Sequence, residues 1–301
     1  MRRLLLLAMA LLATLAPAGA RAALRVVTTT ADLAALVKEI GGGDVAVTAL
    51  ASPGQDPHWV DPRPSLALEL AKADLLIVTG LDLEVGWLPK LVTGARNPQI
   101  LPGRAGYLDA SRAITPLAIP AARDRSQGDV HPRGSPHYLL DPRRAVPVVK
   151  AIAERMGQRD PERAPAYRER GEQSAQRITK WRAHWEAKAK KLKGKKLVAY
   201  HQSFDYLSDW LKFSVIAHVE PRPGIPPNPR HVAQVIETMK RERVPVLLQE
   251  PWFPDTTSKL IAQKAGAALV KLPGAPDAAK GESYVGYMNR VVEQLLAGLE
   301  R

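Results

Sequence analysis

The stretch from Pro161 to Leu192 is the feature that most constrains how this chain of 301 residues can fold. It consists largely of Ala, Glu, Arg, Gln and Lys, which favour the α-helix, with Pro165 and Gly171 near its start as the exceptions. Pro161 suits the first position of a helix, and Gly194 suits the left-handed residue just beyond its end. The pattern predicts one helix of 32 residues, a rod roughly 48 Å long at about 1.5 Å per residue.

Segments with strand and helix patterns alternate both before and after this rod. Such alternation is typical of α/β domains with a parallel sheet. We therefore predict an α/β fold of two lobes, each with a mostly parallel sheet flanked by helices, joined by one long interdomain helix. A coiled-coil arm is the alternative, but it needs apolar residues at sustained heptad spacing, which the rod lacks. The expected organisation is a signal peptide at 1–22, an N-terminal lobe at 23–158, the connecting helix at 159–194 and a C-terminal lobe at 195–301.

Several segments indicate the strands and helices of these lobes. The continuous apolar run Leu75–Val78 is typical of a buried parallel strand, and Leu83–Val92 has the spacing of an amphipathic helix. In the second half, Leu197–Tyr200 and Val244–Gln249 are predicted strands. Ligands of open parallel sheets bind beyond the carboxyl ends of the strands, so we expect a binding site in the cleft between the lobes.

The first 22 residues have the pattern of an export signal. Arg2 and Arg3 precede the apolar run LLLLAMALLATLA, and Ala20-Arg21-Ala22 matches a signal-peptidase site. The chain has no cysteine, which leaves no acceptor for a bacterial lipid anchor and no thiolate for a metal site. We expect a free periplasmic protein that is secreted through a cleaved signal peptide.

The chain is basic, with a formal net charge of +13. Its Lys and Arg residues are scattered over predicted helix faces rather than interleaved with aromatic residues, and the export signal argues against nucleic acid. No segment after the signal reaches the roughly 20 apolar residues that a membrane span needs. We expect a solvated surface, no nucleic-acid partner and no membrane-spanning helix.

Three of the seven histidines lie at strand ends or at the end of a loop. His58 follows the second predicted strand, His137 lies between an irregular segment and a predicted helix, and His201 ends the first strand of the second half. They are separated by 79 and 64 residues, so only the fold could bring them together. Without cysteine, a high-affinity site for a first-row metal would be built from histidine and carboxylate. The alternative is that each ring forms only local hydrogen bonds.

The other four histidines are expected to have smaller roles. His131, in the irregular segment before His137, could capture metal at the mouth of the cleft or lie in solvent. The solvent interpretation is favoured because such loops are mobile. His184 is expected to face solvent on the rod, and His218 and His231 are expected to be structural.

Four short motifs together resemble one family. DPHWVDPRPS, GSPHYLLDP, YHQSF and LLQEPWF occur in this order, with the predicted rod between the second and the third. The chain resembles the metal-binding solute receptors of ABC importers, the ZnuA/TroA-like cluster A-I that handles zinc and manganese. The resemblance covers the whole chain after its signal. It implies that His58, His137 and His201 bind the metal.

The resemblance also implies a fourth ligand, and here the sequence departs from the family pattern. An Asp is expected in a turn after the last strand, where this chain reads LPGAPD with Pro273 at that place. Glu250, in the motif QEPWF, is the first substitute, Asp277 is the second, and a water molecule is also possible. Three histidines without a thiolate favour Zn²⁺ over Mn²⁺, which prefers more oxygen ligands.

The resemblance implies a receptor rather than an enzyme. As a monomer, it would capture Zn(II) in the interlobe cleft and deliver it to an inner-membrane ABC permease with its cytoplasmic ATPase. A manganese-specific receptor and an exported zinc hydrolase are the alternatives, and the hydrolase would need Glu250 as a general base beside a zinc-bound water. A receptor for an organic chelate ranks last, because only 5% of the chain is aromatic.

Overall fold

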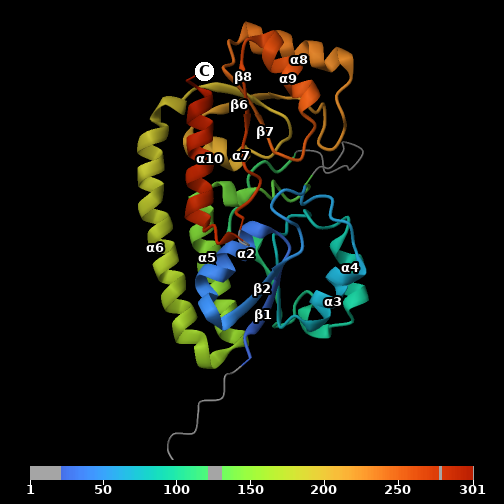
Figure 1. The fold of residues 1–301 in the computed structure, drawn as a ribbon, viewed down its shortest axis with the longest axis vertical. Coiled ribbons are helices and arrows are strands. Elements are labelled where there is room, and N and C mark those ends of the chain that lie inside the picture. Colours follow the sequence, from blue (N-terminus) through green and yellow to red (C-terminus); the bar gives the residue numbers. More distant parts are fainter. Residues whose placement is uncertain (1–21, 121–130, 278–279, 301) are drawn as a thin grey trace, which may run out of the picture.

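The computed structural model describes residues 22–120, 131–277 and 280–300. This part of the chain forms two four-stranded sheets, one in each lobe, and all of the strand pairs within them are parallel. Helices flank both sheets (Figure 1). The predicted α/β fold of two lobes is confirmed. The predicted signal peptide at 1–22 lies outside the described residues except for its last position.

The N-terminal sheet has the strand order β2-β1-β3-β4. Its strands are β1 (Leu24–Thr28), β2 (Val45–Ala49), β3 (Leu75–Val78) and β4 (Tyr107–Asp109). Helices lie on both of its faces (Figure 1), with α2 and α5 on one side and α3 and α4 on the other. These helices are α2 (Ala31–Gly41), α3 (Pro64–Lys72), α4 (Leu88–Ala95) and α5 (Pro142–Arg159).

The C-terminal sheet repeats this arrangement with the order β6-β5-β7-β8. Its strands are β5 (Lys196–Ala199), β6 (Ser214–His218), β7 (Val246–Gln249) and β8 (Ala268–Lys271). Helices α7 and α10 cover the face toward the other lobe's core, and α8 and α9 cover the outer face (Figure 1). These helices are α7 (Asp205–Leu211), α8 (Pro229–Arg241), α9 (Asp255–Ala265) and α10 (Tyr284–Gly298).

One hydrophobic core is shared by both lobes. Alternate residues of a strand point to opposite faces of its sheet, so in β3 Ile77 joins the shared core while Leu76 joins a separate cluster under α3 and α4. In β7, Leu248 joins the shared core and Leu247 packs under α8 and α9. Both sheets therefore bury one face in common, which fixes the two lobes relative to each other.

The predicted long helix that joins the lobes is confirmed. It consists of α6 (Ala164–Lys188), preceded by a 3₁₀ turn at Pro161–Arg163 and followed by another at Ala189–Leu192. In Figure 1 it runs along one side of the molecule, next to α5 and α10. Its buried residues, such as Ile178 and Trp185, belong to the shared core, so the rod is a packed element and not a free arm.

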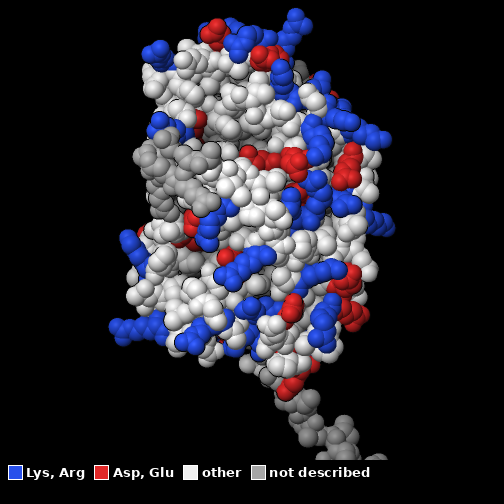
Figure 2. All heavy atoms as spheres, turned by 180° about the vertical axis from the view of Figure 1, so that it is seen from behind, with Lys and Arg blue, Asp and Glu red and all other residues white. Residues whose placement is uncertain are grey.

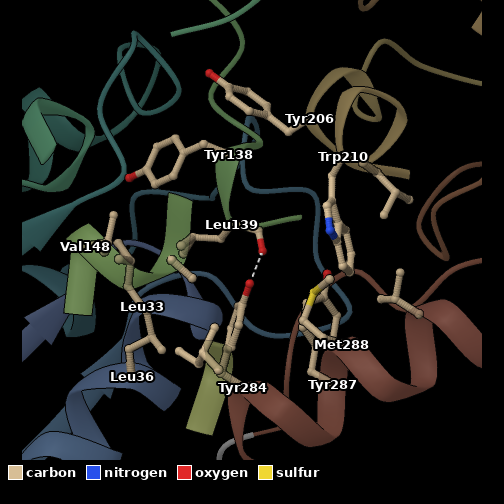
Figure 3. Packing of buried hydrophobic residues seen from close by; sticks show 14 of the residues in the cluster. Leu33, Leu36, Tyr138, Leu139, Val148, Tyr206, Trp210, Tyr284, Tyr287 and Met288 are labelled. Carbon is tan, nitrogen blue, oxygen red and sulfur yellow. Dashed lines mark hydrogen bonds between the residues drawn. The ribbon is translucent and has the colours of Figure 1, made fainter. Parts of the chain in front are cut away.

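Hydrogen bonds also cross between the lobes. The Tyr284 hydroxyl of α10 donates to the carbonyl oxygen of Leu139 at 2.8 Å (Figure 3). The Tyr206 hydroxyl of α7 donates to the carbonyl oxygen of Ser135 at 2.9 Å. Both acceptors lie in the segment that carries His137, so the C-terminal lobe directly supports the backbone around that histidine.

The helix expected at Leu83–Val92 begins later than the sequence pattern indicated. Helix α4 covers Leu88–Ala95, and it is preceded by a turn in which Leu81 and Asp82 have positive φ angles of 53° and 67°. Proline lacks the N–H that an interior helical position must donate, so a helix starts most easily with proline in its first turn. Pro89 occupies that place in α4.

Charged side chains are spread over the surface. On the face in Figure 2, Lys and Arg are intermixed with Asp and Glu rather than gathered in one patch. This distribution fits the solvated surface that the sequence predicts. Among the described residues, none of the helices combines the length and the hydrophobicity needed to cross a membrane.

Trp185 tests whether the shared core makes the lobes unfold together. Its side chain is fully buried and meets Trp210 edge-on at 6.0 Å between ring centroids. We expect Trp185→Ala to lower the free energy of unfolding by about 3 to 5 kcal/mol, with one transition in urea followed by circular dichroism and fluorescence. Trp181→Ala, at the exposed neighbouring ring, is the control and should cost about 1 kcal/mol or less. Separate transitions for the two lobes would contradict a common core.

Candidate metal centre

The C-terminal sheet positions one histidine between two carboxylates. Ala199 of β5 pairs with Leu248 of β7, and two residues further on His201 and Glu250 leave the sheet on neighbouring strands. On the other side of β5, the strand β6 ends in the same way with Glu220. Because the three strands are parallel, their carboxyl ends meet at one edge of the sheet. This edge faces the N-terminal lobe.

The N-terminal lobe contributes loops rather than strand ends. His58 lies in the turn after β2, where Asp56 accepts a hydrogen bond from the His58 backbone N–H at 3.0 Å. The Trp87 indole N–H donates to the carbonyl oxygen of Pro57 at 3.0 Å and holds this turn against the lobe. His137 directly precedes a 3₁₀ turn at Tyr138–Leu140.

The structure brings the three predicted histidines together. The ring centroid of His58 lies 5.2 Å from that of His137 and 5.3 Å from that of His201, and the last two are 6.1 Å apart. His131, for which the solvent interpretation was favoured, joins them with its centroid 5.2 Å from that of His58. The prediction that His131 faces solvent is therefore wrong. Its local sequence gave no sign of this position. Only its place six residues before His137 indicated that it could reach the other rings.

Hydrogen bonds at Nδ1 orient three of these four rings. The Nδ1 atoms are bound to acceptors: Asp56 for His58 (2.7 Å), Leu81 O for His131 (3.1 Å) and Glu220 for His201 (2.6 Å). Such an acceptor places the proton on Nδ1 and leaves Nε2 with a lone pair, the form that binds metal. His137 Nε2 is buried and has no hydrogen-bond partner among the described residues.

Two of these nitrogens lie within hydrogen-bond distance of each other. His58 Nε2 and His131 Nε2 are 3.1 Å apart. A carbonyl oxygen can only accept, so His131 must carry its proton on Nδ1 and present a lone pair at Nε2. Asp56 favours the same tautomer of His58. A positive charge between the rings would turn this close approach into an attraction, and a metal ion supplies one.

The surroundings keep two of these four rings, His131 and His137, neutral. Burial, together with the neighbouring rings of His58 and His201, lowers the pKa of His131 to about 3 and holds the pKa of His137 well below its ordinary value. Burial acts on His201 in the same direction, but its hydrogen bond to Glu220 and the charge of Glu250 outweigh it and raise the pKa of that ring. Neutral imidazole is the ligand form of histidine.

The Glu250 carboxylate also lies in this cleft, and it has no hydrogen-bond partner among the described residues. Its side chain is 5% exposed, and both carboxylate oxygens are buried without a hydrogen bond in the described part of the chain. Burial raises its pKa to about 7, although the positive charge of His201 acts in the opposite direction. Together with His137 it lines a cavity of about 60 Å³ between the lobes. A buried carboxylate of this kind needs a proton or a cation.

The other carboxylate candidate for the fourth ligand, Asp277, has an ion-pair partner of its own. The Asp277 carboxylate forms an ion pair with Lys280 at 2.9 Å. Neither Asp277 nor Glu250 belongs to the described group whose ligand atoms lie within 4.8 Å of one another, His58, His131 and His137. Pro273 and Gly274, which follow β8, line the cavity instead of a carboxylate. A Cβ atom on Gly274 would lie 2.0 Å from Cζ3 of Trp252, so only glycine permits this close packing.

The remaining histidines lie apart from the cluster. His184 is exposed on α6, and its ring meets that of Trp181 at 5.2 Å. His231 bonds through Nε2 to the backbone oxygen of His218 at 3.0 Å, a structural contact within the C-terminal lobe. These observations agree with the roles that the sequence suggested for them.

Comparison with known proteins identifies relatives across nearly the whole chain. The family model ZnuA, "Zinc-uptake complex component A periplasmic", matches residues 26–298. The manganese ABC transporter substrate-binding lipoprotein PsaA of Streptococcus pneumoniae is 23% identical over 287 residues, which cover 92% of this chain and 90% of PsaA. The metal ABC transporter substrate-binding lipoprotein FimA of Streptococcus parasanguinis is 24% identical over 296 residues, 94% of this chain and 91% of FimA.

Solved structures show the same fold. A crystal structure of ZnuA has a TM-score of 0.77 at 21% identity and covers 92% of this chain and 99% of its own. The substrate-binding protein FpvC of P. aeruginosa in complex with Ni²⁺ also has a TM-score of 0.77, at 24% identity, with 92% of this chain and 97% of FpvC covered. The relatives are named as substrate-binding components of transporters, in line with the prediction that the chain is not an enzyme.

The predicted localisation, a free periplasmic protein without a lipid anchor, is contradicted by these names. PsaA and FimA are both named lipoproteins, and lipoproteins carry a lipid anchor. The absence of cysteine is a fact of this chain's composition and does not establish a free protein. The relatives support a substrate-binding role outside the cytoplasm. With a family model that matches residues 26–298, the chain belongs to the ZnuA family, the substrate-binding proteins of metal ABC transporters.

Proposed function

We propose that this protein is a zinc receptor, which captures Zn²⁺ in the interlobe cleft and delivers it to an ABC permease with its ATPase. His58 and His137 from the N-terminal lobe and His201 from the C-terminal lobe are the proposed ligands. The observation that carries the proposal is the convergence of these three rings, whose centroids lie 5.2, 5.3 and 6.1 Å apart. We propose that the receptor acts as a monomer, since the proposed site needs no residue from a second copy of the chain.

Imidazole donors support zinc over manganese. Imidazole suits Zn²⁺, whereas Mn²⁺ prefers carboxylate, carbonyl and water oxygens. The names of the relatives differ on this point, since the family model is described by zinc uptake and PsaA by manganese. FpvC has been crystallised with Ni²⁺ and with Mn²⁺. The choice of zinc therefore depends on the donor atoms of this chain.

Glu250 is the proposed fourth ligand. Its carboxylate is buried, lacks a hydrogen-bond partner among the described residues and leaves the sheet beside His201. Binding to a cation would compensate for the cost of burying this charge. A water molecule is the alternative, since a cavity of about 60 Å³ has room for on the order of two waters at about 30 Å³ each. Asp277 is disfavoured by its ion pair with Lys280.

Isothermal titration with Zn²⁺ tests the site. The wild-type protein should bind one equivalent. The variant with His58, His137 and His201 all changed to Ala should bind Zn²⁺ at least about 100-fold more weakly, because loss of a residue that only hydrogen-bonds to a metal ligand already lowers metal affinity 10- to 100-fold. His184→Ala, at an exposed ring outside the cluster, is the control. Unchanged affinity in the triple variant would reject the site.

Zinc affinity should fall at low pH because a proton on His201 competes with the metal. The pKa of His201 is raised, chiefly through Glu220 against the effect of burial. Glu220→Gln removes that charge and lowers the pKa of His201, so the loss of affinity should shift to lower pH. Titrations between pH 5 and 8 measure the shift, with Glu237→Gln on the exposed face of α8 as the control. A shift in the opposite direction would show that Glu220 does not govern this proton.

Zinc binding should change the overall shape of the molecule only slightly. The shared core and the bonds of Tyr284 and Tyr206 across the lobes would have to break for a wide opening. Small-angle scattering should therefore give the same radius of gyration with and without Zn²⁺, within experimental error. A large decrease on binding would contradict a rigid pair of lobes.

A further inference from the structure

We propose that the end of the C-terminal lobe away from the cleft binds the surface of an anionic phospholipid membrane. Ten lysine and arginine residues lie in the four segments that lead into the strands of the C-terminal sheet, 189–196, 212–213, 240–245 and 264–267. We call them the basic pole: Lys190, Lys191, Lys193, Lys195, Lys196, Lys212, Lys240, Arg241, Arg243 and Lys264. The metal centre takes no part in this second binding surface.

The topology of the sheet gathers these residues at one edge. Its strands are all parallel, so the segments that precede them lie side by side. Lys196 at the start of β5 pairs with Ser214 at the start of β6, and at about 4.8 Å between neighbouring strands the edge is roughly 14 Å wide. The upper end of α6 in Figure 1 leads into it. His201 follows the opposite edge, so a membrane bound at the basic pole would leave the cleft free.

The segment that precedes β5 contributes most of the charge. The sequence KAKKLKGKK at 188–196 has six lysines in nine positions and no acidic residue. Gly194 has a positive φ angle of 75°, and its N–H donates to the carbonyl oxygen of Lys212 at 2.7 Å. This bond fixes the lysine-rich turn beside the segment that precedes β6. The local density of positive charge is therefore built into the backbone.

Most of the basic pole lacks an acidic partner. Glu242 is the one acidic residue of the four segments, and it pairs with Lys196 at 2.6 Å and with Arg241 at 3.3 Å. Two acidic residues from outside the segments form one pair each: Asp209 with Lys212, and Glu300 with Lys191. The other six cations are exposed and form no ion pair in the described part of the chain: Lys190, Lys193, Lys195, Lys240, Arg243 and Lys264.

The corresponding edge of the N-terminal sheet is different. Asp44, which precedes β2, pairs with Arg163 at 3.5 Å and with Arg170 at 2.7 Å. Asp74, which precedes β3, lies 3.7 Å from the guanidinium of Arg25. Acidic residues therefore offset arginines at that edge, whereas most cations of the basic pole have no such partner.

The lack of apolar anchors favours a membrane over an acidic protein as the partner. Interfaces between proteins are centred on aromatic and other large side chains that become buried. Among the described residues, none of the large hydrophobic side chains that are exposed lies in the four segments. An anionic lipid surface attracts lysine and arginine through charge alone. Cations spread over four neighbouring segments suit such an extended surface.

Co-sedimentation with vesicles tests the basic pole. The full chain is mixed with vesicles of equal parts phosphatidylcholine and phosphatidylglycerol, or with vesicles of phosphatidylcholine alone, which measure any binding that needs no lipid charge. The chain should bind the anionic vesicles more tightly at about 0.1 M salt. The difference should disappear at about 1 M salt, because the screening length falls from about 10 Å to about 3 Å.

Charge reversals locate the surface. Lys193→Glu combined with Lys195→Glu should weaken binding to the anionic vesicles at least about 25-fold, because each cation near an anionic lipid surface contributes about fivefold. Lys240→Glu combined with Lys264→Glu, in the segments before β7 and β8, should weaken it in the same way. This second pair distinguishes the whole edge from the single turn before β5.

The matched control carries the same reversals on the N-terminal lobe. Lys72 of α3 and Lys90 of α4 are exposed and form no ion pair in the described part of the chain. Lys72→Glu combined with Lys90→Glu therefore changes the net charge of the protein by the same amount. This variant should bind the anionic vesicles within about twofold of the wild type. Circular dichroism and titration with Zn²⁺ should give wild-type results for every variant.

The outcomes separate this inference from the proposed function. Equal binding to both kinds of vesicle, or a folded variant with Lys193→Glu and Lys195→Glu that binds like the control, would overturn the membrane surface. Binding to polyglutamate but not to anionic vesicles would also overturn it, and would indicate an acidic protein as the partner. A wild-type chain that binds anionic vesicles but not Zn²⁺ would reject the zinc receptor and leave the basic pole intact.

Discussion

Both sheets bury one face in the same hydrophobic core, and the metal centre depends on this constraint. Residues from β3, α6, β7 and α10 all belong to that core, and Figure 3 shows Tyr284 directed at Leu139 within it. Separation of the lobes would expose this apolar surface to water, which is costly. The carboxyl ends of the C-terminal strands are therefore held against the loops of the N-terminal lobe, and side chains of both lobes meet there without a large closing motion.

In three of the four histidines, a hydrogen bond at Nδ1 orients the ring. Asp56, Glu220 and the Leu81 carbonyl fix the tautomers of His58, His201 and His131, so that their Nε2 atoms remain free. Burial keeps His131 and His137 uncharged. The cost of four polar rings and an unpaired carboxylate in a buried place is large, and a bound divalent ion would offset it. This balance is the physical reason to assign the cleft to metal binding.

Periodicity and composition were enough to predict much of the fold. The apolar run at 75–78 became β3, and the helix-rich stretch at 161–192 became α6 with its two 3₁₀ ends. His58, His137 and His201 could be singled out because they follow strands or precede a helix, and strand ends are where parallel sheets bind ligands. Glu250 could be found in the same way, from its place after a buried strand. Their roles as ligands remain proposals.

The sequence by itself determined the alternation of strands and helices, the connecting helix and the supply of histidines in a chain without cysteine, because these depend on local propensity and on composition. Only the tertiary structure decided which side chains meet. His131 lies in an irregular segment with no period to orient it, and its contact with Leu81 joins residues 50 positions apart. Asp277, close in sequence to the expected fourth ligand, pairs with Lys280 instead. Contacts of this kind follow from the packing of whole lobes, which no local pattern encodes.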